Sequence, residues 1–82
     1  MLNRSVIDPG LAAELELLAR FDLHSTQAGL KVRHDAPPAL VAAAARLHAK
    51  GLVTQEDGGF LTDLGIEIAE HLQHVLAALK GH

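Results

Sequence analysis

Cationic side chains gather in the middle of this sequence, and the chemistry they suit is phosphate binding. Between His24 and Gly51, four lysines and arginines stand against one acid, so this stretch carries a formal charge of +3 while the rest of the chain carries −6. A local basic field, more than the net charge of −3, attracts a polyanion. The sequence therefore predicts a duplex-DNA surface made of Lys31, Arg33, His34, Arg46 and Lys50.

Two features limit what such a surface can read. Base recognition needs long polar side chains, but the expected outer face of a helix over 37–50 is mostly alanine, with Arg46 as its one long planar donor. The following hairpin carries Glu56 and Asp57, which phosphate repels. Two alternatives stay open: the cations form an ordinary solvated face, or the alanine face is a seam for a second copy or another protein.

Other chemistry finds little support in the residues. Glu67, Glu70, His71 and His74 lie at three- and four-residue spacings, which suits either a shared metal or solvated ion pairs, and the sequence favours ion pairs. The chain has no cysteine, and its serines and threonines lie in no nucleophile motif. We expect no enzyme activity, no cofactor and no metal.

A first helix must precede the basic stretch. It is expected to begin at Asp8-Pro9, because aspartate caps a free amide and proline suits the first helical position, and to end near Phe21 or Asp22. Helical spacing gives it an apolar stripe of Leu11, Leu15, Leu18 and Phe21. Glu14 is expected to lie away from that stripe.

Two elements then carry the cations. Ser25-Thr26-Gln27 predicts the cap of a short helix through Leu30 or Lys31, and a short strand over 30–32 is the alternative, because Gly29 weakens a helix. The next helix is expected from Pro37 to Lys50, stopped by Gly51. Its predicted inner stripe is Leu40, Val41, Ala44, Leu47 and His48. Its predicted outer face is Ala39, Ala42, Ala43, Arg46, Ala49 and Lys50.

The last third of the chain predicts a hairpin and a long helix. Asp57-Gly58 suits a tight primed turn, pairing residues near Val53 with residues near Leu61. Thr62 or Asp63 then caps the last helix. Its predicted apolar stripe is Leu64, Ile68, Leu72, Val75, Leu76 and Leu79.

This order of elements is mainly α with a small β-hairpin, as in a winged helix-turn-helix. From Ser25 to Leu72 the chain resembles bacterial winged-helix regulators of the multiple-antibiotic-resistance (MarR) type. Leu47–Val53 looks like the end of the recognition helix and the first wing strand, and Leu61-Thr62-Asp63-Leu64-Gly65 looks like the Leu-Thr-x-x-Gly entering the next helix. The chain is also similar to short single-domain bacterial proteins that are often called DNA-binding.

The resemblance implies a recognition helix at about 37–50, a wing at about 52–62, and DNA binding in transcription regulation. The length of 82 residues predicts one domain, 1–82. No apolar run approaches a membrane span and no signal-peptide stretch is present, so a cytoplasmic protein is expected. The apolar stripes of the first and last helices predict a homodimer packed through them. The alternative function is a protein-interaction module with the same fold and no nucleic-acid binding.

Overall fold

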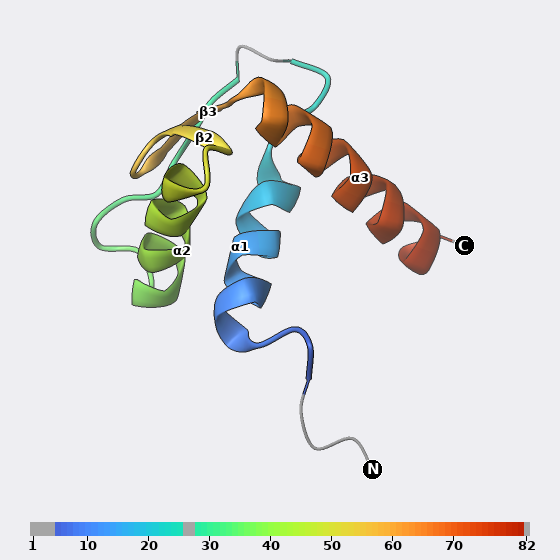
Figure 1. Ribbon diagram of the computed structural model, residues 1–82, viewed down its shortest axis with the longest axis horizontal. Helices are drawn as coiled ribbons and strands as arrows, with labels where there is room; N and C mark the ends of the chain where they lie inside the picture. Colours follow the sequence, from blue (N-terminus) through green and yellow to red (C-terminus); the bar gives the residue numbers. More distant parts are fainter. Residues whose placement is uncertain (1–4, 26–27, 82) are drawn as a thin grey trace.

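Three helices and three short strands make up the part of the chain that the structure, a computed structural model, describes, namely residues 5–25 and 28–81 (Figure 1). The elements are α1 (Pro9–Arg20), β1 (Leu30–Lys31), α2 (Pro38–Ala49), β2 (Val53–Gln55), β3 (Gly58–Leu61) and α3 (Asp63–Lys80). The protein is therefore mainly helical with a small antiparallel sheet, as expected. Within the described residues no helix is long and apolar enough to cross a membrane.

Helix α1 begins where the sequence predicts, but its buried face is wider than the predicted stripe. The Asp8 carboxylate caps it by accepting a hydrogen bond from the Leu11 amide at 2.7 Å. Leu17 and Leu18 are buried, and so is Glu14, which the sequence placed away from the apolar stripe. Of the predicted stripe, Leu18 and Phe21 are buried, and Leu11 and Leu15 are half-buried. The expectation for Glu14 was wrong because α2 lies against the side of α1 that carries Glu14 and Leu17, and α2 supplies the cations that a buried carboxylate needs.

Helix α2 packs on α1 through its smallest residues. Ala43 and Ala44 are 0% and 1% exposed, while Val41 is 36% exposed and His48 is also exposed. The prediction was correct for Ala44 and Leu47 but wrong for Ala43, Val41 and His48. Small side chains let two helices approach closely, so part of the alanine face is used inside the domain. The core consists of Leu17, Leu18, Phe21, Val32, Ala43, Ala44, Leu47 and Val53.

The short helix expected after Ser25 does not form over residues 28–31, where the alternative strand is found. Leu30 and Lys31 pair antiparallel with Gly59 and Gly58 of β3. Thr26 and Gln27 lie outside the described residues. A turn closed by the Ala36 amide on the Arg33 carbonyl at 2.9 Å then leads into α2. Within the described residues, no helix lies between α1 and α2.

The predicted hairpin is confirmed, with strand order β1-β3-β2 and Val53 opposite Leu61. The turn residues are Glu56 and Asp57, one position earlier than predicted, because Gly58 already pairs with Gln55. Gly58 has a φ of +121°, and a Cβ there would collide with the Leu30 carbonyl oxygen. The glycine is therefore needed for β1 to join the sheet, not for the turn.

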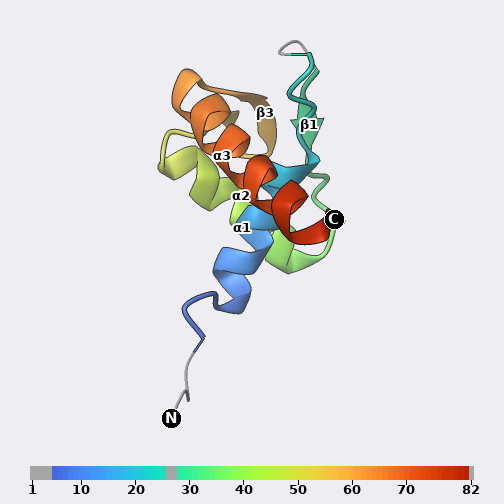
Figure 2. The same cartoon turned by 90° about the vertical axis from the view of Figure 1, so that its right-hand side faces the viewer.

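Helix α3 is capped by Thr62, as predicted, and is tied to the rest of the fold at two points. Thr62 Oγ1 accepts a hydrogen bond from the Gly65 amide at 3.0 Å and donates one to the Gly51 carbonyl at 2.6 Å. Further along, Gln73 Nε2 donates to the Phe21 carbonyl at 3.0 Å, at the end of α1. The C-terminal half of α3 diverges from α1 in Figure 1, and Figure 2 shows α3 on the outside of the molecule.

The apolar stripe predicted for α3 is only partly inward. Gly65 and Ala69 are buried, and Leu72 and Leu76 are half-buried. Four of the six predicted residues are exposed instead: Leu64 (50%), Ile68 (36%), Val75 (49%) and Leu79 (80%). The difference arises because the helix contacts the domain through its glycine and alanine side, where close approach is possible.

Candidate functional site

The five residues predicted to bind DNA do not form one surface. Arg46 lies on α2 and Lys50 directly follows that helix, and both contact α1. Lys31 lies on β1, and Arg33 and His34 lie in the turn after it. The structure thus divides the predicted site into two groups: an inner pair, Arg46 and Lys50, whose side chains contact α1 and are 41% and 52% exposed, and a more exposed group.

The inner pair is held by Glu14, whose side chain is only 7% exposed. Arg46 Nε donates to one carboxylate oxygen at 2.9 Å, and Lys50 Nζ donates to the other. Arg46 also donates through Nη2 to the Gly10 carbonyl at 3.0 Å. The guanidinium, predicted to face outward, therefore binds the first turns of α1. Sequence reasoning missed Glu14 as a partner, although its spacing from Leu17 and Leu18 places all three on one helical face.

The electrostatics of Glu14 follow from this contact. Burial alone would raise the pKa of its carboxyl group, but the hydrogen bonds and positive charges of Lys50 and Arg46 outweigh burial and leave the pKa below its ordinary value. Glu14 is therefore ionised at neutral pH. Arg46 and Lys50, two of the five residues predicted to bind DNA, thus share one internal carboxylate, and the three side chains together keep a single positive charge.

The exposed group has acidic neighbours as well. Lys31 Nζ lies 4.0 Å from an Asp57 carboxylate oxygen, and Arg33 Nε lies 3.2 Å from one of Asp35. The Lys31 and Arg33 side chains are each 76% exposed, so these ion pairs are weak and easily exchanged. An open pocket beside α2 is lined by Lys31, Val32, His34, Val41, Ala44, Ala45, Gln55, Glu56 and Asp57. The pocket has mixed charge, because Glu56 and Asp57 of the hairpin turn line it together with Lys31.

The solvent-facing side of α2 has no long hydrogen-bond donor. Its exposed residues are Pro38, Ala39, Val41, Ala42, Ala45, His48 and Ala49. His48 is the only one with a polar side chain, and it lies in the last turn. Direct readout of bases in a major groove requires several such side chains near the start of a recognition helix.

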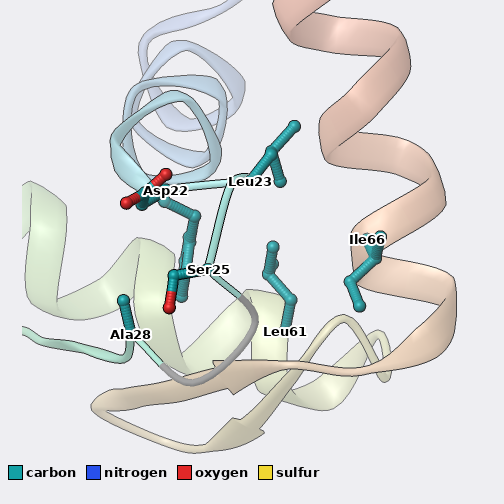
Figure 3. A pocket seen from close by; sticks show the side chains of 7 residues that line it. Asp22, Leu23, Ser25, Ala28, Leu61 and Ile66 are labelled. Atoms are coloured by element: carbon teal, nitrogen blue, oxygen red, sulfur yellow. The ribbon is translucent and has the colours of Figure 1, made fainter.

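A small pocket lies where the end of α1 meets β3 and α3 (Figure 3). It encloses about 20 Å³, which is room for little more than a water molecule. Among its described residues are Phe21, Asp22, Leu23, Ser25, Ala28, Leu61 and Ile66. The Asp22 carboxylate is engaged locally, since it accepts a hydrogen bond from the His24 amide at 2.8 Å. This pocket is too small to hold a substrate.

The residues considered for metal binding stay on the outside of α3. Glu67, Glu70, His71 and His74 are all exposed. No group of three or more histidines, aspartates or glutamates in the described part of the chain is arranged to hold a metal ion.

The chain belongs to a family of unknown function (DUF5669), whose sequence pattern matches residues 5–80. No curated protein and no solved structure matches it. The match covers every described element from α1 to α3.

Proposed function

We propose that this protein is a winged-helix-type module that works through contacts with proteins and does not read DNA sequence. In the winged-helix scheme, α2 takes the place of the recognition helix, the β2–β3 hairpin that of the wing, and α3 that of the following helix. A helix-turn-helix needs a helix before the recognition helix. In the described residues, strand β1 and a turn occupy the position directly before α2 where that helix would lie.

One observation carries this proposal: Arg46, the long donor expected on the outside of α2, is bound to Glu14 and to the Gly10 carbonyl. Apart from His48, the exposed residues of α2 are apolar. Apolar side chains that are exposed on a helix suit a protein partner better than a phosphate backbone.

The experiment that tests the proposal is a titration of the protein into labelled duplex DNA, followed by fluorescence anisotropy, at two salt concentrations. We expect no saturable binding at physiological salt. Sub-micromolar binding that distinguishes between DNA sequences would overturn the proposal, since even non-specific DNA-binding proteins have Kd values of roughly 10⁻⁴–10⁻⁶ M there.

The second candidate function is non-specific DNA binding through Lys31, Arg33 and His34. It is favoured by the 76% exposure of the Lys31 and Arg33 side chains, whose ion pairs a phosphate can replace. If DNA binds in this way, its affinity falls with salt by a slope of about −0.9 per phosphate contacted. Arg33→Ala then flattens the slope by about one unit, equally for all sequences.

The matched control is Arg20→Ala. Arg20 is also a surface arginine in a 3.2 Å ion pair, with Glu16, but it lies on α1 and outside the predicted site. Neutralising Glu56 and Asp57 together is expected to strengthen such binding, because two acids near the duplex are removed. Equal effects of Arg33→Ala and Arg20→Ala rule out a localised DNA surface.

A further inference from the structure

The long apolar face that the described part of the domain leaves uncovered is on α3. Its exposed apolar residues are Leu64, Ile68, Val75 and Leu79. Their spacings of four, seven and four residues place them in one stripe along the helix. The stripe predicted on α1 is largely covered, because Leu18 and Phe21 belong to the core and Leu11 and Leu15 are half-buried. Of the two helices predicted to form a homodimer interface, only α3 therefore keeps a long exposed apolar face.

The order of residues in this stripe is symmetric. Leu64 and Leu79 are equally distant from a point between His71 and Leu72, and Ile68 and Val75 are equally distant from that same point. When a second α3 packs antiparallel across a two-fold axis at this point, Leu64 meets Leu79 of the second copy and Ile68 meets its Val75. Binding of a different protein to this face would not require symmetric spacing of the apolar residues.

The polar flank of the stripe fits the same arrangement. With 3.6 residues per turn, Glu67 and His74 lie on the same side of the stripe, and both are exposed. They lie on opposite sides of the proposed axis, Glu67 about 7 Å and His74 about 4 Å from it along the helix, an offset of about 3 Å that long side chains can span. Antiparallel packing thus brings Glu67 of one copy close to His74 of the other, where the carboxylate can accept a hydrogen bond from the imidazole. The two-fold axis generates a second, equivalent contact between Glu67 and His74.

We infer that the partner of this α3 face is a second copy of the chain, packed antiparallel about a two-fold axis between His71 and Leu72. The inference rests on the proposed function as a protein-interaction module, and it names that module's first partner. It also gives a role to the C-terminal turns of this 18-residue helix, which diverge from α1 beyond the Gln73 contact (Figure 1).

The first test is sedimentation equilibrium of the full chain over a range of concentrations, comparing Ile68→Glu with Val41→Glu. Both positions are 36% exposed, but Val41 lies on α2, outside the stripe. The unchanged chain is expected to dimerise in the micromolar range. Ile68→Glu should raise the dimer dissociation constant at least about tenfold, because it places two carboxylates in an apolar contact, while Val41→Glu leaves the constant unchanged. Circular dichroism confirms that both variants keep their helices.

The second test fixes the direction of packing. The chain has no cysteine, so single thiols can be introduced by Ile68→Cys and Val75→Cys in separate chains. In an antiparallel pair, the mixture forms a disulfide between the two different chains. Each chain alone crosslinks poorly, since equal positions lie about 10 Å apart along the helix, beyond the reach of a disulfide.

The results separate the alternatives. A monomer at high micromolar concentration, a dimer that survives Ile68→Glu, or crosslinks between equal positions only would each overturn the inference. The DNA titration gives an independent result. A monomer that does not bind DNA leaves the proposed function with another partner, whereas a dimer that binds DNA specifically rejects the proposed function and keeps the α3 pairing.

Discussion

The Glu14 carboxylate binds the side chains of Arg46 and Lys50 and so limits their availability to a ligand. From the sequence, Arg46 and Lys50 belong with Lys31 and Arg33, because a count of charges cannot show which of them face an internal acid. The acid lies more than thirty positions away, and it reaches α2 only because α1 and α2 pack side by side. Predictions for single residues were therefore reliable where the partner is local, as at the Asp8 and Thr62 caps.

Glu14→Gln is expected to lower the free energy of unfolding by about 1–3 kcal/mol at pH 7, since it removes the charge that Arg46 and Lys50 surround. The pKa of Glu14 is lowered in the folded chain, so its contribution is present above its ordinary value near 4.5 and is lost as pH falls through the lower folded value. The difference between the two chains should therefore shrink below about pH 4.5. Urea unfolding at several pH values measures it.

The control is Glu16→Gln. Glu16 also pairs with an arginine, Arg20, but its side chain is 57% exposed. A change of less than about 0.5 kcal/mol is expected at pH 7. If both glutamates gave the same loss, or if the effect of Glu14→Gln grew in acid, the role assigned to the buried carboxylate would be wrong.

Among the elements, those with strong local signals were predictable and those set by tertiary contacts were not. Periodicity and caps located α1, α2 and α3 to within a residue or two, and the Asp57-Gly58 sequence with apolar residues on both sides located the hairpin. Strand β1 has only two residues and exists because β3 offers an edge with room at Gly58. The inward faces of α1 and α2 were misjudged in part: Glu14 is buried because α2 supplies its partners, and Ala43 is buried because alanine suits both a core and a surface.

The orientation of α2 can be tested with two neighbouring alanines. Ala43 is fully buried and Ala42 is exposed, although the sequence placed both outward. Ala43→Leu should cost about 1–3 kcal/mol because the added methyl groups have no space between α1 and α2. Ala42→Leu should change stability by no more than about 0.5 kcal/mol. Thermal and urea unfolding of the two variants compares them directly, and equal costs would contradict the packing.

The glycine of the Leu-Thr-x-x-Gly sequence has a structural role that a similar pair of variants tests. A Cβ at Gly65 would collide with the Leu52 carbonyl oxygen, whereas a Cβ at Gly10, also in the first turn of a helix, would meet no atom closer than 3.4 Å. Gly65→Ala is expected to destabilise the fold by roughly 2 kcal/mol or more through backbone displacement. Gly10→Ala should be neutral or stabilising by up to about 1 kcal/mol, because alanine favours helix. Urea unfolding midpoints of the two variants measure this difference in stability, and equal midpoints would contradict the structural role of Gly65.

At the scale of the whole molecule, charge and apolar surface are separated. The lysines and arginines predicted to bind DNA each contact an acid, with Arg46 and Lys50 sharing Glu14, while four apolar residues of α3 are exposed to solvent. A domain of this size buries a modest core, so covering that face in the proposed dimer would add a large share of its stability. The net charge can be read from the sequence, but it does not predict this separation of charged and apolar surface. The arrangement of charges depends on which helices contact each other.

Coupling between association and stability gives the last prediction. If folding and pairing through α3 are linked, the Tm of the unchanged chain should rise with protein concentration, by roughly 3–6 °C per tenfold increase for a dimer of small domains. Ile68→Glu should remove this dependence, since the variant unfolds as a monomer, and Val41→Glu should retain it. Differential scanning calorimetry over a hundredfold concentration range measures all three chains. A Tm of the unchanged chain that is independent of concentration would mean that the exposed stripe of α3 contributes nothing to stability through self-association, because mass action requires the shift whenever the dimer is the folded state.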